Sequence, residues 1–255
     1  MPIQSYYEAI AGHYDEIFPL SAITLGFLAE LAGDAPAPVT DIACGNAAYA
    51  LALAERGHRV TAIDLDVGML AAAREKVADA GVEERLLLLE GDMLALAELE
   101  PEPARLAFCI GNSLVHLPDP AAMARFLEQA RAALLPGGSL VLQIINYDRV
   151  IGKGLPGLPT LSNEAAGLTF ERMYERVDNP AEPGLLPGRR FTFHTRLTVK
   201  GRTWESRIPL YPLLSDELTV LLDKAGFRDM RFHGDFRGSP YVPGESYALI
   251  AVATV

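Results

Sequence analysis

The stretch from Val39 to Asp66 constrains the fold more than any other part of the chain. Two short apolar runs, Val39–Ala43 and His58–Ile63, flank a turn of small residues and an Ala/Leu-rich segment. This order predicts a strand, a turn, a helix ended by Gly57, and a second strand. Such a unit forms a right-handed crossover between parallel strands, and its first turn is where open α/β sheets bind ligands.

The small residues of this turn predict a cofactor that contains a nucleoside. Gly45, flanked by Ala43 and Ala47, lets the backbone approach a ligand closely, and the amides that open the next helix favour a negative group. Asp64 ends the second strand, where its carboxylate can accept hydrogen bonds from both ribose hydroxyls. The alternative is that Gly45 only permits a tight turn and that Asp64 only caps the next helix.

The turn does not fit the nicotinamide fingerprint G-x-G-x-x-G, since Ala43, Gly45 and Ala48 occupy those positions. Asp41 followed by Ala43, Gly45 and Ala47 resembles the first motif, acidic-x-Gly-x-Gly-x-Gly, of class I S-adenosylmethionine-dependent methyltransferases. The resemblance implies an α/β fold with a doubly wound, seven-stranded, mostly parallel Rossmann-like sheet and an antiparallel β insertion. It implies S-adenosylmethionine as cofactor. The two alanines would need a positive φ, which is costly for a residue other than glycine.

Further motifs extend the resemblance along the chain. In the resembled family, the Asp and the apolar residue after the third strand contact the adenine, which assigns Asp92 and Met93. The segment YYEAIAGHYDEIF resembles the Tyr-rich lid of small-molecule methyltransferases, so Tyr14 would approach the cofactor or the acceptor. The cofactor-binding residues expected on this basis are Tyr14, Asp41, Ala43, Cys44, Gly45, Asn46, Asp64, Leu65, Met69, Asp92, Met93, Ile110, Gly111, Asn112 and Ser113.

The segment Gly111–Leu117 resembles the Gly-Asn-Ser-x-x-His-Leu of glycine/sarcosine N-methyltransferase-like chains. It follows the fourth strand, whose carboxyl end faces the transferred methyl group in that architecture. His116 and Tyr14 are therefore the candidate catalytic residues, because a hydroxyl acceptor would need a base. A structural role for His116 in orienting the loop is an equal alternative.

An insertion after the fifth strand interrupts the alternation of helices and strands. Leu168–Val177, Arg189–Lys200 and Arg202–Leu210 predict a three-stranded antiparallel sheet, while the Pro- and Gly-rich segments before and between them predict irregular connections. Aromatic and cationic side chains there and nearby are candidates for binding a polar or carboxylate acceptor. They are Tyr6, Asn146, Tyr147, Arg149, Arg172, His194, Arg207, Tyr211 and Tyr241, with Arg237 beside the last. For Tyr6, docking of an N-terminal helix is an equal alternative.

The expected organisation has three parts: an N-terminal helical lid over residues 1–38, a cofactor-binding α/β core over 39–146 and 213–255, and the β insertion over 147–212, which would cover the substrate site. The net charge of −11 argues against nucleic acid and anionic membrane as partners and favours a small soluble acceptor. The resemblance to glycine/sarcosine N-methyltransferase-like chains implies that this acceptor is an amine or an amino or carboxylic acid. Scattered histidines and two cysteines predict no metal site.

A cytoplasmic monomer or homodimer is expected, because no secretory signal or apolar span is visible in the sequence. Two other functions remain open at this point. A nicotinamide-dependent oxidoreductase could use a related sheet, and a protein that binds S-adenosylmethionine without catalysis could retain the fold.

Overall fold

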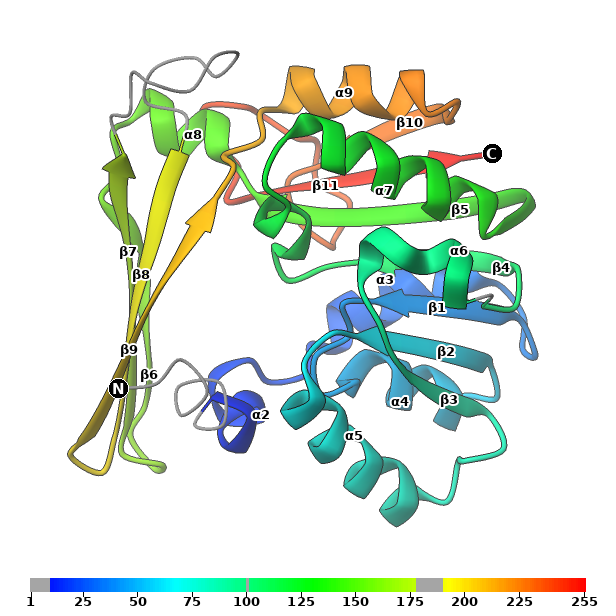
Figure 1. The fold of residues 1–255 in the computed structure, drawn as a ribbon, viewed down its shortest axis with the longest axis horizontal. Coiled ribbons are helices and arrows are strands. Elements are labelled where there is room, and N and C mark those ends of the chain that lie inside the picture. Colours follow the sequence, from blue (N-terminus) through cyan, green and yellow to red (C-terminus); the bar gives the residue numbers. More distant parts are fainter. Residues whose placement is uncertain (1–9, 100, 178–189) are drawn as a thin grey trace.

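A computed structural model of the chain describes residues 10–99, 101–177 and 190–255. It contains two sheets that stand side by side (Figure 1). Sheet A has seven strands in the order β10-β11-β5-β4-β1-β2-β3, and all neighbours are parallel except those of β11. Its strands are β1 (Pro38–Ile42), β2 (Arg59–Asp64), β3 (Leu86–Glu90), β4 (Ala104–Cys109), β5 (Leu134–Ile145), β10 (Arg228–His233) and β11 (Ala248–Thr254). The predicted fold class is confirmed.

Helices cover both faces of sheet A, as a doubly wound sheet requires. On one face, α3 (Ala22–Ala32), α4 (Ala48–Glu55) and α5 (Val67–Ala80) pack against apolar side chains of the strands. The opposite face is covered by α7 (Pro120–Ala132) and α9 (Ser215–Lys224), with the short elements η1 (Met93–Ala95), α6 (Leu96–Leu99) and η2 (Ser113–His116) beside them. Side chains of successive β4 residues point alternately into the buried apolar clusters on the two faces of sheet A, and this alternation fixes the register of the central strand.

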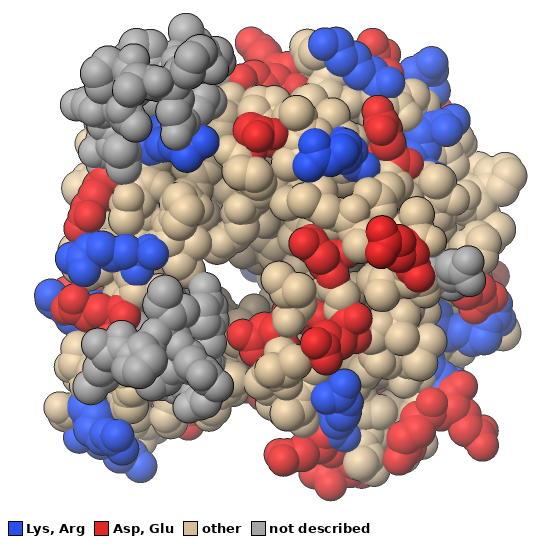
Figure 2. All heavy atoms as spheres, viewed as in Figure 1, with Lys and Arg blue, Asp and Glu red and all other residues tan. Residues whose placement is uncertain are grey.

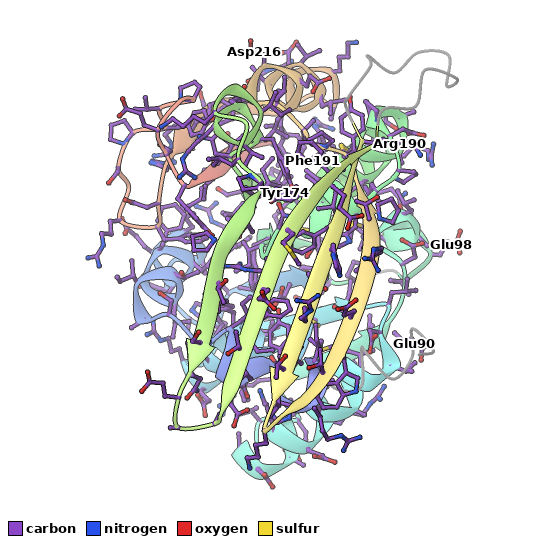
Figure 3. All side chains as sticks on the ribbon, turned by 90° about the vertical axis from the view of Figure 1, so that its left-hand side faces the viewer. Glu90, Glu98, Tyr174, Arg190, Phe191 and Asp216 are labelled. Carbon is purple, nitrogen blue, oxygen red and sulfur yellow. The ribbon has the colours of Figure 1, made fainter. Side chains whose placement is uncertain are left out.

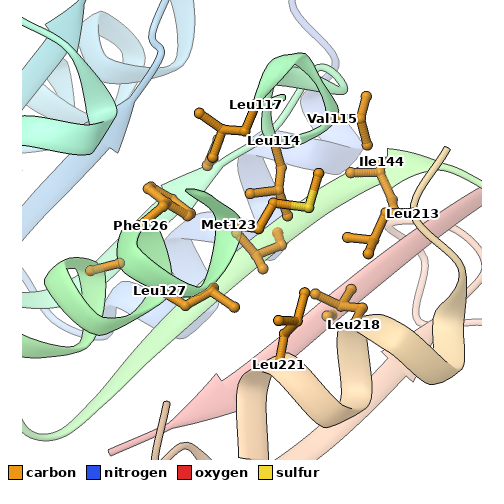
Figure 4. Packing of buried hydrophobic residues seen from close by; sticks show 14 of the residues in the cluster. Leu114, Val115, Leu117, Met123, Phe126, Leu127, Ile144, Leu213, Leu218 and Leu221 are labelled. Carbon is orange, nitrogen blue, oxygen red and sulfur yellow. The ribbon is translucent and has the colours of Figure 1, made fainter. Parts of the chain in front are cut away.

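Helix α7 shows how local sequence positions the core. Asp119 caps the helix by accepting a hydrogen bond from the Ala122 amide at 2.8 Å, and Pro120 occupies the first helical turn. Phe126 and Leu127 are fully buried, and Leu127 lies on the side of α7 that faces Leu221 of α9 (Figure 4). Burial of side chains of this size contributes about 1.5–3 kcal/mol each, so the α7–α9 layer anchors the face of sheet A behind β4 and β5.

Sheet B is formed by the insertion and has four antiparallel strands rather than the predicted three. They are β6 (Gly157–Asn163), β7 (Leu168–Val177), β8 (Arg190–Val199) and β9 (Arg202–Leu210). The additional strand β6 lies at the edge of sheet B and contains Pro159. Proline has no backbone N–H, and an edge strand tolerates it because such a strand forms hydrogen bonds on one side only. The Pro- and Gly-rich segment before β7, predicted to be irregular, therefore contains an edge strand and the helix α8 (Tyr147–Gly152).

Sheet B stands beside the carboxyl ends of the parallel strands of sheet A, with α2 (Tyr14–Ile17) between the two layers (Figure 1). Ile17 of α2 packs in one buried cluster with Met69 of α5 and Phe170 of β7. Pro19 lies in the short connection that separates α2 from α3. No helix within the three described ranges combines the length and the apolar character that a membrane span requires. The edge of sheet A where open α/β sheets bind ligands therefore faces sheet B (Figure 1).

Candidate active site

The loop after β1 takes a conformation that normally requires glycine. Ala43, Gly45 and Ala47 have φ values of 58°, 58° and 57°, so both alanines adopt the left-handed conformation of the glycines they replace. The Cys44 amide donates a hydrogen bond to the Ile63 carbonyl at 3.0 Å, which holds the loop against the end of β2. The resemblance therefore extends to the backbone of the loop although two of its three glycines are absent.

Tyr14 of α2 lies directly over this loop. A Cβ atom added at Gly45 would lie 3.4 Å from the Tyr14 ring and hydroxyl, which is an ordinary van der Waals contact, so the φ of 58° rather than a lack of space favours glycine at this position. Burial, followed by the negative charges of Asp41 and Asp64, raises the pKa of Tyr14 to about 12. The hydroxyl therefore stays protonated near neutral pH, a state in which it can donate a hydrogen bond and cannot accept a proton as a base would.

Two carboxylates flank the loop. Asp64 accepts hydrogen bonds from the Gly45 amide at 2.6 Å and from the Asp66 amide at 2.8 Å, and it is half-buried at the end of β2. Asp41 is buried at the end of β1, and its pKa is raised well above the usual value by desolvation and by the charge of Asp64. Desolvation likewise raises the pKa of Asp64. A positively charged ligand would stabilise the ionised form of both groups.

A cavity of about 430 Å³ opens between the loop and sheet B. Figure 2 shows the molecule hollowed between sheet B and the α/β core. The wall on the core side is formed by Asp41, Ala43, Cys44, Asn46, Ala48, Tyr49, Ile110, Gly111 and Gln143. The remaining wall comes from the N-terminal segment, sheet B and the last connection, with Tyr14, Ile17, Phe18, Pro19, Thr24, Leu161, Arg172, Phe236 and Tyr247. The volume is within the range of small-molecule sites.

The structure brings part of the expected cofactor set to this cavity. Tyr14, Asp41, Ala43, Cys44, Asn46, Ile110 and Gly111 line it. Gly45 and Asp64 are joined to the same loop by their hydrogen bond. The others lie further out: Leu65 is exposed next to Asp64, Met69 packs against α2 and sheet B, and Asp92 caps η1 by accepting from the Leu94 amide. Met93 packs against the core under α7, while Asn112 and Ser113 hold the turn after β4.

Of the candidate acceptor residues, only Arg172 lines this cavity in the described part of the chain. Asn146 is fully buried, and its amide group donates to the Pro243 and Ser246 carbonyls at 2.8 Å, which fixes the connection before β11. Three tyrosines also serve structural contacts: Tyr147 with Asn112, Tyr211 with Glu217, and Tyr241 with Asn146 and Asp148. Arg149 lies over the Tyr247 ring, and Tyr6 is outside the described residues.

His194 and Arg207 lie on the face of sheet B that is turned away from the cavity. They are directly opposite each other in the β8–β9 ladder, and His194 also pairs with Met173, the residue after Arg172. Since successive side chains of a strand point to opposite faces, Arg172 lies on the other face. The His194 ring nitrogens contact Glu175 at 3.2 Å and Glu205 at 3.4 Å.

His116 does not line the cavity. It ends η2, and although the residue as a whole is exposed, desolvation by the chain packed around it lowers its pKa below the usual value. The imidazole is therefore neutral at neutral pH. Its location favours the structural alternative, orientation of the turn after β4, over proton transfer inside the cavity.

Sequence reasoning missed several lining residues, among them Gln143, Tyr49 and Tyr247. Gln143 could have been found, because it is the one polar side chain in the apolar run Leu140–Ile145. Its side-chain oxygen accepts a hydrogen bond from the Gly111 amide at 2.7 Å and so shapes the cavity floor. The others depend on how distant segments meet and carry no local signal.

The lining fits a cationic cofactor that carries a nucleoside. The Asn46 side-chain oxygen is buried and has no hydrogen-bond partner in the protein, and Asp41 is a buried carboxylate beside it in the cavity wall. Both groups would accept hydrogen bonds from an ammonium group of the ligand, which would repay their desolvation. Asp64 keeps acceptor capacity beyond its two backbone bonds, as contact with ribose hydroxyls requires.

Comparisons with known proteins agree with this geometry. Residues 39–138 match the family of the methyltransferase domain. Glycine N-methyltransferase of Oryctolagus cuniculus is 27% identical over 230 residues, which cover 82% of this chain and 75% of that protein. The ubiquinone biosynthesis O-methyltransferase of Pseudomonas aeruginosa is 30% identical over 133 residues, and the match spans 52% of this chain and about half (55%) of that relative.

The fold is also found among solved structures. The CcbJ methyltransferase from Streptomyces caelestis superposes with a TM-score of 0.77 at 23% identity, covering 97% of this chain and 96% of that one. The family match begins at β1 and includes the loop after it, β2 and β4, which carry the site described above. These findings decide against the nicotinamide-dependent and non-catalytic alternatives. Residues 39–138 form a methyltransferase domain, the whole chain has the fold of the class I methyltransferases, and the protein is a methyltransferase that uses S-adenosylmethionine as its cofactor.

Proposed function

We propose that this enzyme methylates the nitrogen of a small soluble amine or amino acid. The observation that carries the proposal is the cavity between the loop after β1 and sheet B, which places acidic groups at the cofactor end and Arg172 at the insertion end. The cofactor supplies a methyl group on a sulfonium, which is already a good leaving group. The chain must then bind the acceptor, align it with the methyl group and exclude water.

The state of the lining groups supports nitrogen as the accepting atom. The Tyr14 hydroxyl and the Cys44 thiol both have raised pKa values, mainly because they are desolvated, and stay protonated near neutral pH. No histidine lines the cavity in the parts of the chain that the structure describes. A neutral amine needs no base because its lone pair attacks directly, whereas a hydroxyl must lose a proton.

The relatives are compatible with this proposal without fixing the acceptor. One is named a glycine N-methyltransferase and another an O-methyltransferase of ubiquinone biosynthesis. The match to the glycine N-methyltransferase extends over 82% of this chain, whereas the match to the O-methyltransferase extends over 52%. This difference in coverage favours an amine or amino acid acceptor over a phenolic one.

A panel of amines, amino acids, carboxylic acids and phenols tests the proposal. Transfer of a labelled methyl group would be followed with purified enzyme, and the product's methyl carbon would be assigned as N-bound or O-bound by NMR. We expect N-methyl products. Products that carry only O-methyl groups would contradict the proposal. Gly45→Val is the matched control that we expect to be inactive, because a β-branched residue at φ 58° strains the loop after β1.

A further inference from the structure

Arg172 has no carboxylate partner among the described residues, unlike Arg196 and Arg207 of the same sheet. Arg196 pairs with Glu205 at 2.8 Å and with Glu171 at 3.4 Å, and Arg207 lies 3.6 Å from Glu175. Among the described residues, no ion pair involves Arg172, although the chain has 33 acidic and 22 basic residues. In so acidic a protein, an arginine without a carboxylate is available for an anion from outside.

The environment of Arg172 is prepared for such an anion. Its Nη2 donates to the Pro159 carbonyl at 2.6 Å, which fixes the guanidinium against the edge strand β6. Its Nε is buried and has no hydrogen-bond partner in the protein. A buried donor left without an acceptor costs about 1–3 kcal/mol, and a carboxylate beside Nε would remove this cost through a charge-assisted hydrogen bond.

Arg172 also lies where two cavities meet. It borders the cofactor cavity together with Tyr247, and it borders a second cavity of about 380 Å³ along the edge strand, together with Arg149. The Arg149 guanidinium lies 5.9 Å from the centre of the Tyr247 ring, so a second cation stands behind this wall. An acceptor that enters along the edge strand would meet Arg172 before it reaches the loop after β1.

The two faces of sheet B separate this group from the ion pairs. Figure 3 shows the outer face, where polar side chains cover the strands, and labels Tyr174 and Phe191 near one end. Tyr174 lies on the same inner face as Arg172, because one residue separates the two along β7. The centre of its ring lies 5.1 Å from that of Phe191 and 5.5 Å from that of Phe193. Arg172 is thus a charged group on a mostly apolar inner face, where an ionic contact is weakly screened.

We propose that Arg172 binds the carboxylate of the acceptor at the boundary between the two cavities, and so selects amino acids over amines that carry no acid group. This inference rests on the proposed function and adds the acidic group of the substrate. The acceptor's amine then points from Arg172 toward the loop after β1, where the cofactor-binding residues lie. Arg172 is a specificity-determining residue, since it recognises a group that does not react.

Two measurements test the inference, one of which needs no knowledge of the acceptor. Binding of ¹³C-labelled acetate to the complex with S-adenosylhomocysteine would be titrated by NMR for wild type, Arg172→Gln and Arg207→Gln. We expect Arg172→Gln to weaken binding by about 10- to 100-fold, as for a lost charge-assisted hydrogen bond, and Arg207→Gln to leave it unchanged. Equal binding in all three proteins, or no saturable binding to wild type, would overturn the inference.

The second measurement compares amino acids with their carboxamides as acceptors. The ratio of kcat/KM for the acid to kcat/KM for the amide should decrease by about 10- to 100-fold in Arg172→Gln. The ratio for Arg172→Lys should be intermediate between those of Arg172→Gln and wild type, because lysine keeps the positive charge and loses the bidentate hydrogen-bonding geometry of the guanidinium group. Amides used as well as acids by wild type would overturn the role of Arg172 while leaving N-methylation intact. Acetate binding at Arg172 without methylation of any amine would overturn the proposed function alone. Thermal unfolding of each variant checks that it is folded.

Discussion

The Asn46 side-chain amide donates a hydrogen bond to Asp15 at 2.8 Å, across the boundary between α2 and the loop after β1. The second oxygen of Asp15 lies 2.5 Å from the Lys76 ammonium of α5. These contacts lower the pKa of Asp15 although its partial burial acts in the other direction. Asp15 thus connects α2 to two parts of the core, and its neighbour Tyr14 is held over Gly45 as a result.

Replacing Asp15 with alanine is expected to weaken S-adenosylmethionine binding by about three- to tenfold. The Asp15 side chain is half-exposed, so the lost ion pair contributes at most about 1 kcal/mol, and the effect arises from a less ordered α2. Isothermal titration measures the dissociation constant. Lys76→Gln keeps the bond to Asn46 and serves as the matched control, with a smaller effect. Identical affinity in Asp15→Ala and wild type would refute a positioning role.

Asp64→Ala is expected to lower cofactor affinity by about 1.5–3 kcal/mol, the contribution of hydrogen bonds to a charged group. Part of this loss would be indirect: the Gly45 amide would lose the carboxylate that accepts its hydrogen bond at 2.6 Å, and the loop after β1 would lose its conformation as a result. Asp66→Ala is the control, because Asp66 caps α5 through the Met69 amide and its loss should cost about 1 kcal/mol of stability without weakening cofactor binding. Similar affinities for both variants would remove Asp64 from the site.

The two alanines with positive φ give a prediction about stability. A residue other than glycine in the left-handed conformation destabilises the folded state by about 1–2 kcal/mol. Replacing alanine by glycine removes this strain and at the same time costs about 0.4–1 kcal/mol, because glycine loses more backbone entropy on folding. Ala43 is half-buried, so Ala43→Gly should stabilise the protein by about 0.5–1 kcal/mol. Ala47 is buried, and losing its methyl group, about 0.8 kcal/mol, should cancel the gain.

Urea unfolding of both variants measures these differences. Ala50→Gly is the matched control, since Ala50 lies within α4 and is fully buried, so glycine should destabilise it by about 1 kcal/mol or more. A loss of stability in Ala43→Gly as large as that in Ala50→Gly would show that Ala43 does not adopt the left-handed conformation in solution.

These alanines also show where sequence reasoning stops. The order of strand, turn, helix and strand around Gly45 follows from local patterns, and so do the face of β8 that carries Phe191 and Phe193 and the cap of α7. A positive φ at alanine cannot be read locally, because tertiary contacts impose it against the residue's own preference. The inward direction of Arg172 and the outward direction of His194 depend on the register between β7 and β8, which only the folded sheet fixes.

The raised pKa of Asp41 predicts a pH dependence of stability with a definite sign. Its pKa is near 3.9 in the unfolded chain and higher in the folded protein, so the folded state binds the proton more tightly. The corresponding stability is complete below about pH 4 and is lost as the pH rises through the folded pKa. Asp41→Asn abolishes this loss, so the stability of the variant relative to wild type should increase with pH.

The cofactor should reverse the effect, because a cationic ligand favours ionised Asp41. Affinity for S-adenosylmethionine is therefore expected to rise with pH through the same window in wild type and to change less in Asp41→Asn. Urea unfolding and titration calorimetry at several pH values between about 4.5 and 8 measure both quantities. Parallel stability curves for the two proteins would show that Asp41 has the same pKa in both states.

Tyr14→Phe separates the two roles that a tyrosine over the cofactor loop can have. With a pKa of about 12, the hydroxyl does not titrate near neutral pH, and removing it should lower kcat/KM by about tenfold or less, the contribution of one neutral hydrogen bond. Tyr14→Ala should cost more, because it also removes the ring that covers Gly45 and packs 5.1 Å from Phe18. Methyl-transfer kinetics with and without saturating cofactor distinguish lost binding from lost catalysis. A fall of about a thousandfold or more in kcat for Tyr14→Phe, with cofactor affinity retained, would instead identify the hydroxyl as a group that transfers a proton during the reaction.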